Sequence, residues 1–161
     1  MSGNPLARSL PACCALALAL ASGTPSADAA EACKAIRHEI LHVPADRDDW
    51  TSAQLTIRPN DVILVHAGGR LSVGGDAGRT TGAKGLADGS GALEMKVGTG
   101  TVAPVGTRWF GSFRDYGTLK FRIAAVRRPQ LAGSYEVNLV VIPAEILPET
   151  IRLELAEPDR P

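Results

Sequence analysis

Two histidines and a glutamate near the start of the chain have the spacing of a zinc site. Residues 38–42 read HEILH and match the pattern HExxH, in which both histidines bind Zn²⁺ and the glutamate acts as general base. Asp48 follows where some enzymes of this kind keep a third ligand. The chemistry that this pattern suggests is that of a zinc metallopeptidase, provided that the segment forms a helix.

The residues around this motif favour a strand instead. Pro44 lies two positions after His42 and would end a helix there, and Ala45 occupies the glycine position of the extended motif. In a strand, His38 and His42 share one face, which leaves a surface metal site as an alternative. We predict a strand with two half-exposed histidines, no metal ligands, no cofactor and no catalytic residues.

The N-terminal residues have the pattern of a secretory signal. Arg8 precedes the apolar run LPACCALALALA, and the small residues Ala27-Asp28-Ala29 follow. The run is shorter than the roughly 20 residues that span a bilayer. We expect residues 1–29 to be a signal peptide and residues 30–161 to be one domain, periplasmic or extracellular, with no membrane attachment after cleavage.

The composition of the expected mature chain excludes several classes of partner. The full chain has 17 basic and 17 acidic residues, and loss of Arg8 and Asp28 leaves 16 of each. This balance gives no indication of binding to nucleic acid or to an anionic membrane. Only Cys33 of the three cysteines remains, so we expect no disulfide within the domain. The role of Cys33 stays open between an inert thiol and a link to another chain.

Apolar residues alternate with polar ones along most of the mature chain, which is typical of strands with one buried face. The segments LEMKV, TLKFRI and SYEVNLV show this alternation, and VILVHA is an apolar run suited to an inner strand. Residues 68–91 are rich in glycine and are expected to be mostly loop. The pattern predicts an all-β fold, an antiparallel β-sandwich of jelly-roll type with eight to nine short strands.

Five segments together resemble the galactose-binding bacterial lectins of the PA-IL type. They are DVILVHAGG, GSGALEMKVGTGTVAPVG, RWFGSF, YGTLKFRIAA and AGSYEVNLVV, preceded by VPADRDDWTSAQLTIRPND. The resemblance covers residues 43–142 and implies a secreted sandwich domain that binds carbohydrate. A further strand is expected over residues 149–156, beyond the lectin pattern, where it could cover a sheet edge or pair with a second subunit.

The resemblance also implies where a sugar and a calcium ion would bind, but the residues at those positions differ from the family. The calcium carboxylate falls on Ala125, the asparagine pair falls near Gln130 and Leu131, and the sugar-contacting histidine loop falls on residues 81–84. Calcium binds through six to eight oxygens, so we expect this site to be lost. The polar residues left for a ligand at these loops are Lys84, Asp88, Arg127 and Gln130.

Two functions follow from these patterns. The first is a lectin-like, calcium-independent carbohydrate-binding domain. Trp50 and Trp109 could each offer an apolar surface to a sugar ring, but we predict that both pack within the domain. The second is a structural or protein-interaction module on the same scaffold. A homo-oligomer is compatible with both, and an enzyme is not expected because no GxSxG serine is present and His66 lies on an expected strand.

Overall fold

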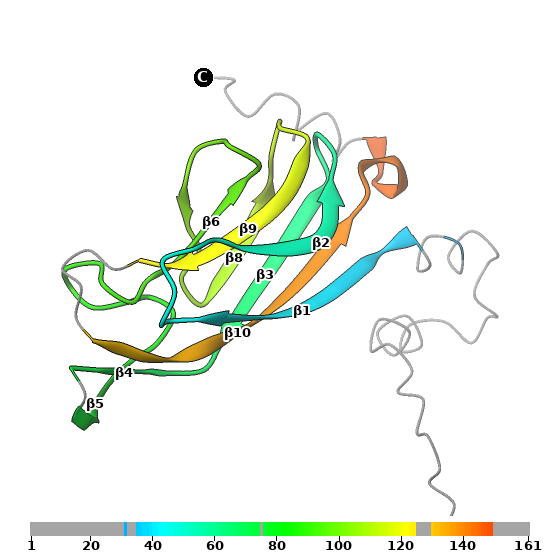
Figure 1. The fold of residues 1–161 in the computed structure, drawn as a ribbon. Coiled ribbons are helices and arrows are strands. Elements are labelled where there is room, and N and C mark those ends of the chain that lie inside the picture. The colour runs from blue at the N-terminus through cyan, green and yellow to red at the C-terminus, as the bar shows by residue number, and fades with distance from the viewer. Residues whose placement is uncertain (1–30, 32–34, 75, 125–129, 150–161) are drawn as a thin grey trace, which may run out of the picture. The chain divides into compact units, whose positions relative to one another are not determined.

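The computed structural model describes residues 31, 35–74, 76–124 and 130–149, and its strands all belong to one compact unit that starts at Ile36 (Figure 1). The described residues form ten strands and one short 3₁₀ helix. They are β1 (Arg37–Pro44), β2 (Thr51–Ile57), β3 (Val62–Gly68), β4 (Leu71–Val73), β5 (Asp76–Thr81), β6 (Leu93–Val97), β7 (Ala103–Pro104), β8 (Arg108–Ser112), β9 (Gly117–Ile123), β10 (Leu131–Ile142) and η2 (Ala144–Ile146).

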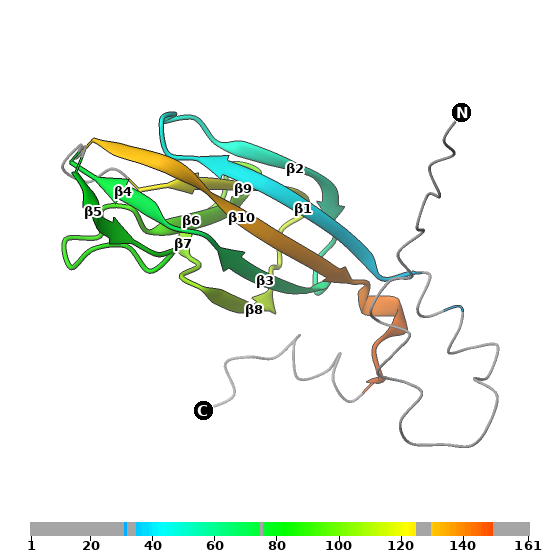
Figure 2. The ribbon, with the colours of Figure 1, turned by 90° about the horizontal axis from the view of Figure 1, so that it is seen from below.

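The strands pair into two antiparallel sheets. One has the order β5-β4-β10-β3-β8, with β1 on the other side of β10, and the second has the order β2-β9-β6-β7. The long strand β10 organises the first sheet, because its start pairs with β4 and its remainder lies between β1 and β3. Seen from below, β10 runs along the domain between β1 and β3 (Figure 2).

The core lies between the layers and follows from the alternation in the sequence. In β6 and β9, and in β10 from Tyr135 onward, every second side chain is buried, and the residues between them face outward. Burying one face of each strand removes apolar area from water at about 25 cal/mol per Å², which is the main stabilising contribution to such a sandwich. The largest fully buried side chains are Tyr135, Phe121, Ile57, Ile63, Leu71, Leu93, Met95, Leu119 and Leu139.

A buried carboxylate fixes the end of the domain where β1 begins. Asp61 accepts hydrogen bonds from Arg37 Nη2 at 2.9 Å, from the Arg58 amide at 3.0 Å and from the Ala144 amide at 3.1 Å. Its side chain is 1% exposed. The same Arg37 donates to the Thr56 carbonyl at 2.6 Å. These bonds join β1, the β2–β3 turn and η2.

The predicted fold class is confirmed: the domain is an all-β antiparallel sandwich. The described residues contain ten strands, more than the eight or nine expected, because the glycine-rich region contains β4 and β5. That region was expected to be mostly loop, and the two strands in it form by pairing with each other and with β10. The expected signal peptide and most of the expected strand over 149–156 lie outside the described residues.

Candidate functional site

The HEILH segment forms strand β1, as the sequence predicts, and not a helix. His38 and His42 are both exposed on the outer face, and the glutamate between them has a structural partner. Both carboxylate oxygens of Glu39 lie 2.9 Å from the amide nitrogen of Gln54, and one is 3.1 Å from the amide of Leu55. The described residues include no group of three His, Cys, Asp or Glu side chains that could hold a metal ion.

The loops predicted to carry a ligand do meet at one end of the sandwich. The amide of Gly74, at the β4–β5 turn, donates to the Gln130 carbonyl at 2.7 Å, and the amide of Gly91 donates to the Ala124 carbonyl at 2.7 Å. Residues 124 and 130 flank the segment 125–129, which lies outside the described residues. The glycine-rich region is therefore bonded to both flanks of the β9–β10 connection, and we call this region the loop end.

A buried tyrosine supports the loop end from below. The hydroxyl of Tyr135, on β10, donates to the Gly91 carbonyl at 2.9 Å, and its side chain is fully buried. Burial raises the pKa of the Tyr135 phenol to about 12 from its ordinary value of 10.0, because the charged phenolate is poorly solvated in the core. The position of the loop before β6 thus depends on the packing of β10.

The polar residues predicted at the loop end have different environments. Lys84 is exposed and forms an isolated β-bridge with Ala92, while Asp88 is exposed and accepts a hydrogen bond from the Ser90 amide at 3.0 Å. Gln130 is exposed and directly precedes β10, and Arg127 lies outside the described residues. The structure places the described three on loops that meet at one end.

These side chains supply few of the oxygen atoms that a calcium ion needs. Calcium requires six to eight oxygen ligands, commonly with carboxylates among them. Among the predicted ligand residues in the described part of the loop end, the one carboxylate is that of Asp88. It accepts a hydrogen bond from the Ser90 amide within its own turn. The hydroxyl of Ser90 is buried and has no hydrogen-bond partner within the described residues.

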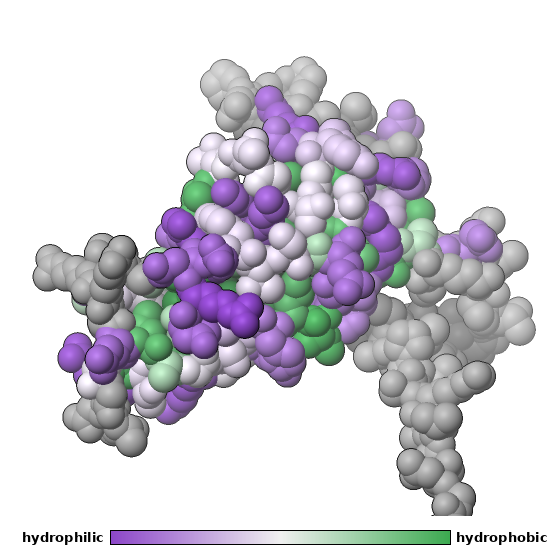
Figure 3. Space-filling view, in the orientation of Figure 1, coloured by the Kyte–Doolittle hydropathy of each residue, from purple (hydrophilic) through white to green (hydrophobic). Residues whose placement is uncertain are grey.

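Both tryptophan rings are half-buried and pack against neighbouring side chains. Lys96 Nζ and Arg122 Cζ lie 4.4 and 4.5 Å from the ring centroid of Trp50, so the ring already has cationic partners. The ring of Trp109 stacks on Phe113 with centroids 5.2 Å apart and packs against the core. The packing role expected for Trp109 is confirmed, and Trp50 packs against the outer surface of the second sheet. The surface that carries β2 and β9 is largely hydrophilic (Figure 3).

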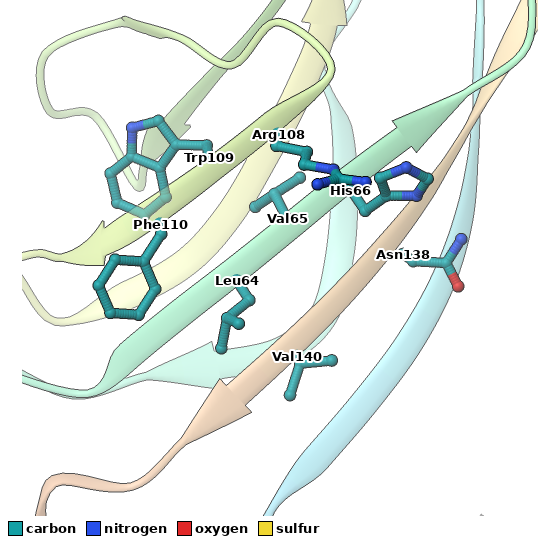
Figure 4. Close-up of a pocket in the computed structure, with 8 residues that line it drawn as sticks. All are labelled: Leu64, Val65, His66, Arg108, Trp109, Phe110, Asn138 and Val140. Carbon is teal, nitrogen blue, oxygen red and sulfur yellow. The ribbon is translucent and has the colours of Figure 1, made fainter. Parts of the chain in front are cut away.

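The outer face of the first sheet carries a shallow depression of about 440 Å³ that the sequence did not reveal. The exposed side chains of Phe110 on β8 and Leu64 on β3, and the half-buried side chain of Val140 on β10, lie on the same side of the sheet (Figure 4). Their strands pair so that Leu64 lies between Phe110 and Val140. We call these three residues the apolar row.

A second row of residues lies on the same three strands, two positions along each strand from the apolar row. Arg108, His66 and Asn138 are paired in register across β8, β3 and β10, and we call them the polar row. The Arg108 guanidinium points toward the His66 ring (Figure 4). His66 was expected at a strand end beside a neighbouring partner, and it is exposed on this face.

One signal in the sequence could have indicated this surface. Trp109 and Phe110 are adjacent in an expected strand, so they must face opposite sides of the sheet, and one of them must be outside. Which one is outside is decided by the pairing of β8 with β3, which the residues of β8 alone do not specify. Phe110 is 70% exposed, whereas Trp109 is partly buried.

The domain is similar in fold to a lectin. No protein-family model matches the sequence, and no curated protein matches it. Among solved structures, the chain resembles one described as "EclA N-terminal domain; PllA-like lectin", with a TM-score of 0.55 and 18% sequence identity. The match covers 67% of this chain and 98% of that chain. At this level of identity the likeness shows the fold: the chain contains a sandwich with the fold of a complete lectin domain.

Proposed function

We propose that this protein is a lectin-like carbohydrate-binding domain that works without calcium and without catalysis. The observation that carries the proposal is the fold likeness, which spans 98% of a domain described as a lectin. The resemblance to galactose-binding lectins implies that certain loops bind the ligand. Those loops meet at one end of the same sandwich. Both lines of support indicate one class of ligand, a glycan.

At the loop end, hydrogen bonding to sugar hydroxyl groups would come from Lys84 and Gln130. Both side chains are exposed, and they offer an ammonium donor and an amide that both donates and accepts. Asp88 adds a carboxylate acceptor on the loop between them in sequence. Arg127 is proposed as a fourth contact, from its position in the sequence.

A second function has one observation in its favour. Ile40, Leu64 and Phe110 are 52%, 37% and 70% exposed on the outer face of the first sheet. Adjacent exposed apolar side chains are typical of surfaces that contact another protein. A protein-interaction module, including one that forms a homo-oligomer through this face, is therefore the alternative to a carbohydrate-binding domain.

Titration calorimetry with galactose-containing oligosaccharides tests the proposed function. The titration is performed with EDTA and again with calcium, and we expect the same affinity in both buffers. Replacing Lys84 and Gln130 together by alanine should weaken binding about tenfold or more, because each removes hydrogen bonds worth roughly 0.5–1.5 kcal/mol. An affinity that appears only when calcium is added would contradict the calcium-independent site.

The matched control replaces Arg114 and Asp115, which are also exposed, by alanine. They lie at the other end of the sandwich, because the neighbouring Phe113 carbonyl accepts a hydrogen bond from the Asn60 amide just before β3 begins. This control should bind sugar as tightly as the wild type. If both double variants lose affinity equally, the loop end is not the binding site.

We also propose that residues 1–29 direct the protein out of the cytoplasm and are removed. The support is the pattern of a basic residue, an apolar run and small residues in the sequence. Intact-mass measurement of protein recovered from the periplasm and the medium should give a chain that begins at Ala30. A full-length chain confined to the cytoplasm would contradict this localisation.

A further inference from the structure

The outer face of the first sheet combines an apolar surface with polar side chains that can donate hydrogen bonds. The apolar row (Leu64, Phe110 and Val140) and the polar row (Arg108, His66 and Asn138) lie next to each other in register. Residues two apart on a strand are separated by about 6.6 Å, and neighbouring strands by about 4.8 Å. A molecule that lies across both rows would contact carbon atoms on one side and nitrogen donors on the other.

The apolar row provides a flat surface at its β8 end. The Phe110 ring is 70% exposed, and Leu64 lies beside it on the paired strand. An aromatic ring of this kind buries a large apolar area against a partner and favours stacked arrangements. A sugar ring has one face composed of C–H groups, so it matches this surface and carries its hydroxyl groups at the edge.

The polar row provides a positive charge that is not neutralised within the described residues. Elsewhere in the described residues, three arginines form ion pairs: Arg37 with Asp61, Arg58 with Glu145, and Arg122 with Glu94. Arg108 takes part in none of the ion pairs of the described residues, and its paired neighbour His66 adds an imidazole ring. An arginine is the side chain best suited to bind a carboxylate through two parallel hydrogen bonds.

One acidic side chain lies on the same face and limits the orientation of a ligand. Glu136 is exposed on β10, pairs across the strands with Gly68, and accepts a weak hydrogen bond from Asn138 Nδ2 at 3.4 Å. Arg108 lies on β8, with β3 between it and β10. A carboxylate bound at Arg108 therefore lies on the side of the face away from Glu136.

We propose that this face is a second glycan-binding surface that selects sugars carrying a carboxylate, such as uronic acids. The carboxylate binds Arg108 with His66 as an additional donor, and the C–H face of the sugar ring stacks on Phe110. This inference rests on the proposed carbohydrate-binding function and adds a site separate from the loop end. It also accounts for the exposed apolar row without a protein partner.

The test is a set of NMR titrations of the isotope-labelled protein with trigalacturonic acid, with a neutral galactose trisaccharide, and with hexanoate. We expect trigalacturonic acid to shift amide signals of β3, β8 and β10, and to bind at these three strands at least tenfold more tightly than either other probe. Equal shifts from hexanoate would show that the face binds any apolar carboxylate, and would overturn the selection for sugars. Equal binding of the neutral trisaccharide at these strands would overturn the selection for charge.

Three variants on this face and two control variants locate the contacts. Arg108→Gln and Phe110→Ala should each weaken binding of trigalacturonic acid about tenfold or more. The conservative change Phe110→Tyr keeps an aromatic ring and should retain the affinity of the wild type. The controls Arg114→Gln and Tyr116→Ala change side chains that are also exposed, Tyr116 to 71%, and should leave the affinity unchanged. Unchanged affinity in both Arg108→Gln and Phe110→Ala would exclude this face.

Two further readouts separate this inference from its alternatives. Sedimentation of the wild type should show a monomer whose size does not change in Phe110→Ala; a dimer that this variant dissociates would make the face a subunit interface and overturn the proposal. If neutral glycans bind at the loop end while trigalacturonic acid does not bind β3, β8 and β10, only the second surface is wrong. If no glycan binds anywhere, the proposed function fails as well.

Discussion

The carboxylate of Glu39 joins the two sheets of the sandwich by accepting the backbone N–H of Gln54, with both oxygens 2.9 Å from the nitrogen. Glu39 lies on β1 of the first sheet, and Gln54 lies on β2 of the second. The pairing of β2 with β9 shifts register between Ser52 and Thr56, so the amides in between lack regular partners there. Glu39, which occupies the position of a catalytic base in the HExxH pattern, therefore binds the backbone of β2 where that strand is irregular.

Replacing Glu39 by alanine should lower the free energy of unfolding by about 2 kcal/mol. The substitution removes hydrogen bonds from a charged acceptor to the amides of Gln54 and Leu55, and such bonds contribute roughly 1.5–3 kcal/mol. Urea unfolding followed by tryptophan fluorescence measures the change. The control His38→Ala, an exposed neighbour, should change stability by no more than about 0.5 kcal/mol.

The wild type and the His38→Ala variant also test the zinc interpretation of the motif. We expect the zinc content of the purified protein to be the same before and after His38→Ala, because the segment is a strand and the described residues contain no metal-binding cluster. Atomic absorption measures the content. Stoichiometric zinc that His38→Ala removes would show that the two exposed histidines hold a surface ion.

Removal of the Asp61 carboxylate should destabilise the domain much more strongly. Asp61→Ala leaves the Arg37 guanidinium beside a buried position together with two unpaired amides, and breaking a buried pair in this way costs about 3–5 kcal/mol. Glu145→Ala is the matched control, since it breaks an ion pair with Arg58 whose side chains are 68% and 60% exposed. Its effect should stay below about 1 kcal/mol. Equal losses in the two variants would contradict the buried role of Asp61.

The stability of the domain should fall at alkaline pH because of Tyr135. Its pKa in the folded protein is about 12, above the ordinary 10.0, so the unfolded chain loses the proton first as the pH rises. The contribution is fully present below pH 10 and is lost as the pH approaches 12. We expect the wild type to lose about 2 kcal/mol more than Tyr135→Phe between pH 9 and pH 11.5.

Urea unfolding at both pH values gives this comparison. Tyr116→Phe, which changes an exposed tyrosine, should retain the full pH dependence of the wild type. At neutral pH, Tyr135→Phe should be less stable by about 1 kcal/mol because the Gly91 carbonyl loses its partner. An identical pH dependence in wild type and Tyr135→Phe would show that the phenol does not titrate differently in the two states.

Two glycines of one loop should respond differently to alanine. Gly85 has a φ of +76°, and a Cβ there would lie 2.6 Å from the Ala92 amide nitrogen, whereas a Cβ on Gly82 would have no atom within 4 Å. Gly85→Ala should lower the unfolding free energy by about 1–3 kcal/mol and weaken sugar binding at the neighbouring Lys84. Gly82→Ala should be neutral or stabilise by up to about 1 kcal/mol. Equal effects on stability would contradict the described geometry of this loop.

Much of the fold follows from the local alternation of apolar and polar residues, because a strand with one buried face has an apolar residue at every second position. β6, β9 and β10 lie where the alternation predicts them. β4 and β5 were missed because they are short and glycine-rich, and they exist through pairing between residues distant in sequence, such as Leu71 with Gly133. Pairing of this kind depends on the whole sheet.

The candidate sites were predictable to different degrees. The convergence of the loops at Lys84, Asp88 and Gln130 followed from the resemblance to a known scaffold. The outer-face depression was missed because no single segment indicates it: Phe110, Leu64 and Val140 come from three strands and become neighbours through register alone. The partner of Glu39 was missed for the same reason, since it lies on another sheet.

A glycan array probed in EDTA with a protein that spans residues 30–161 tests the central claim most directly. We predict binding to a defined group of glycans, with the signal retained in Arg114→Ala/Asp115→Ala and reduced about tenfold in Lys84→Ala/Gln130→Ala. A folded wild-type domain that binds no glycan on the array would contradict the account and favour the protein-interaction module.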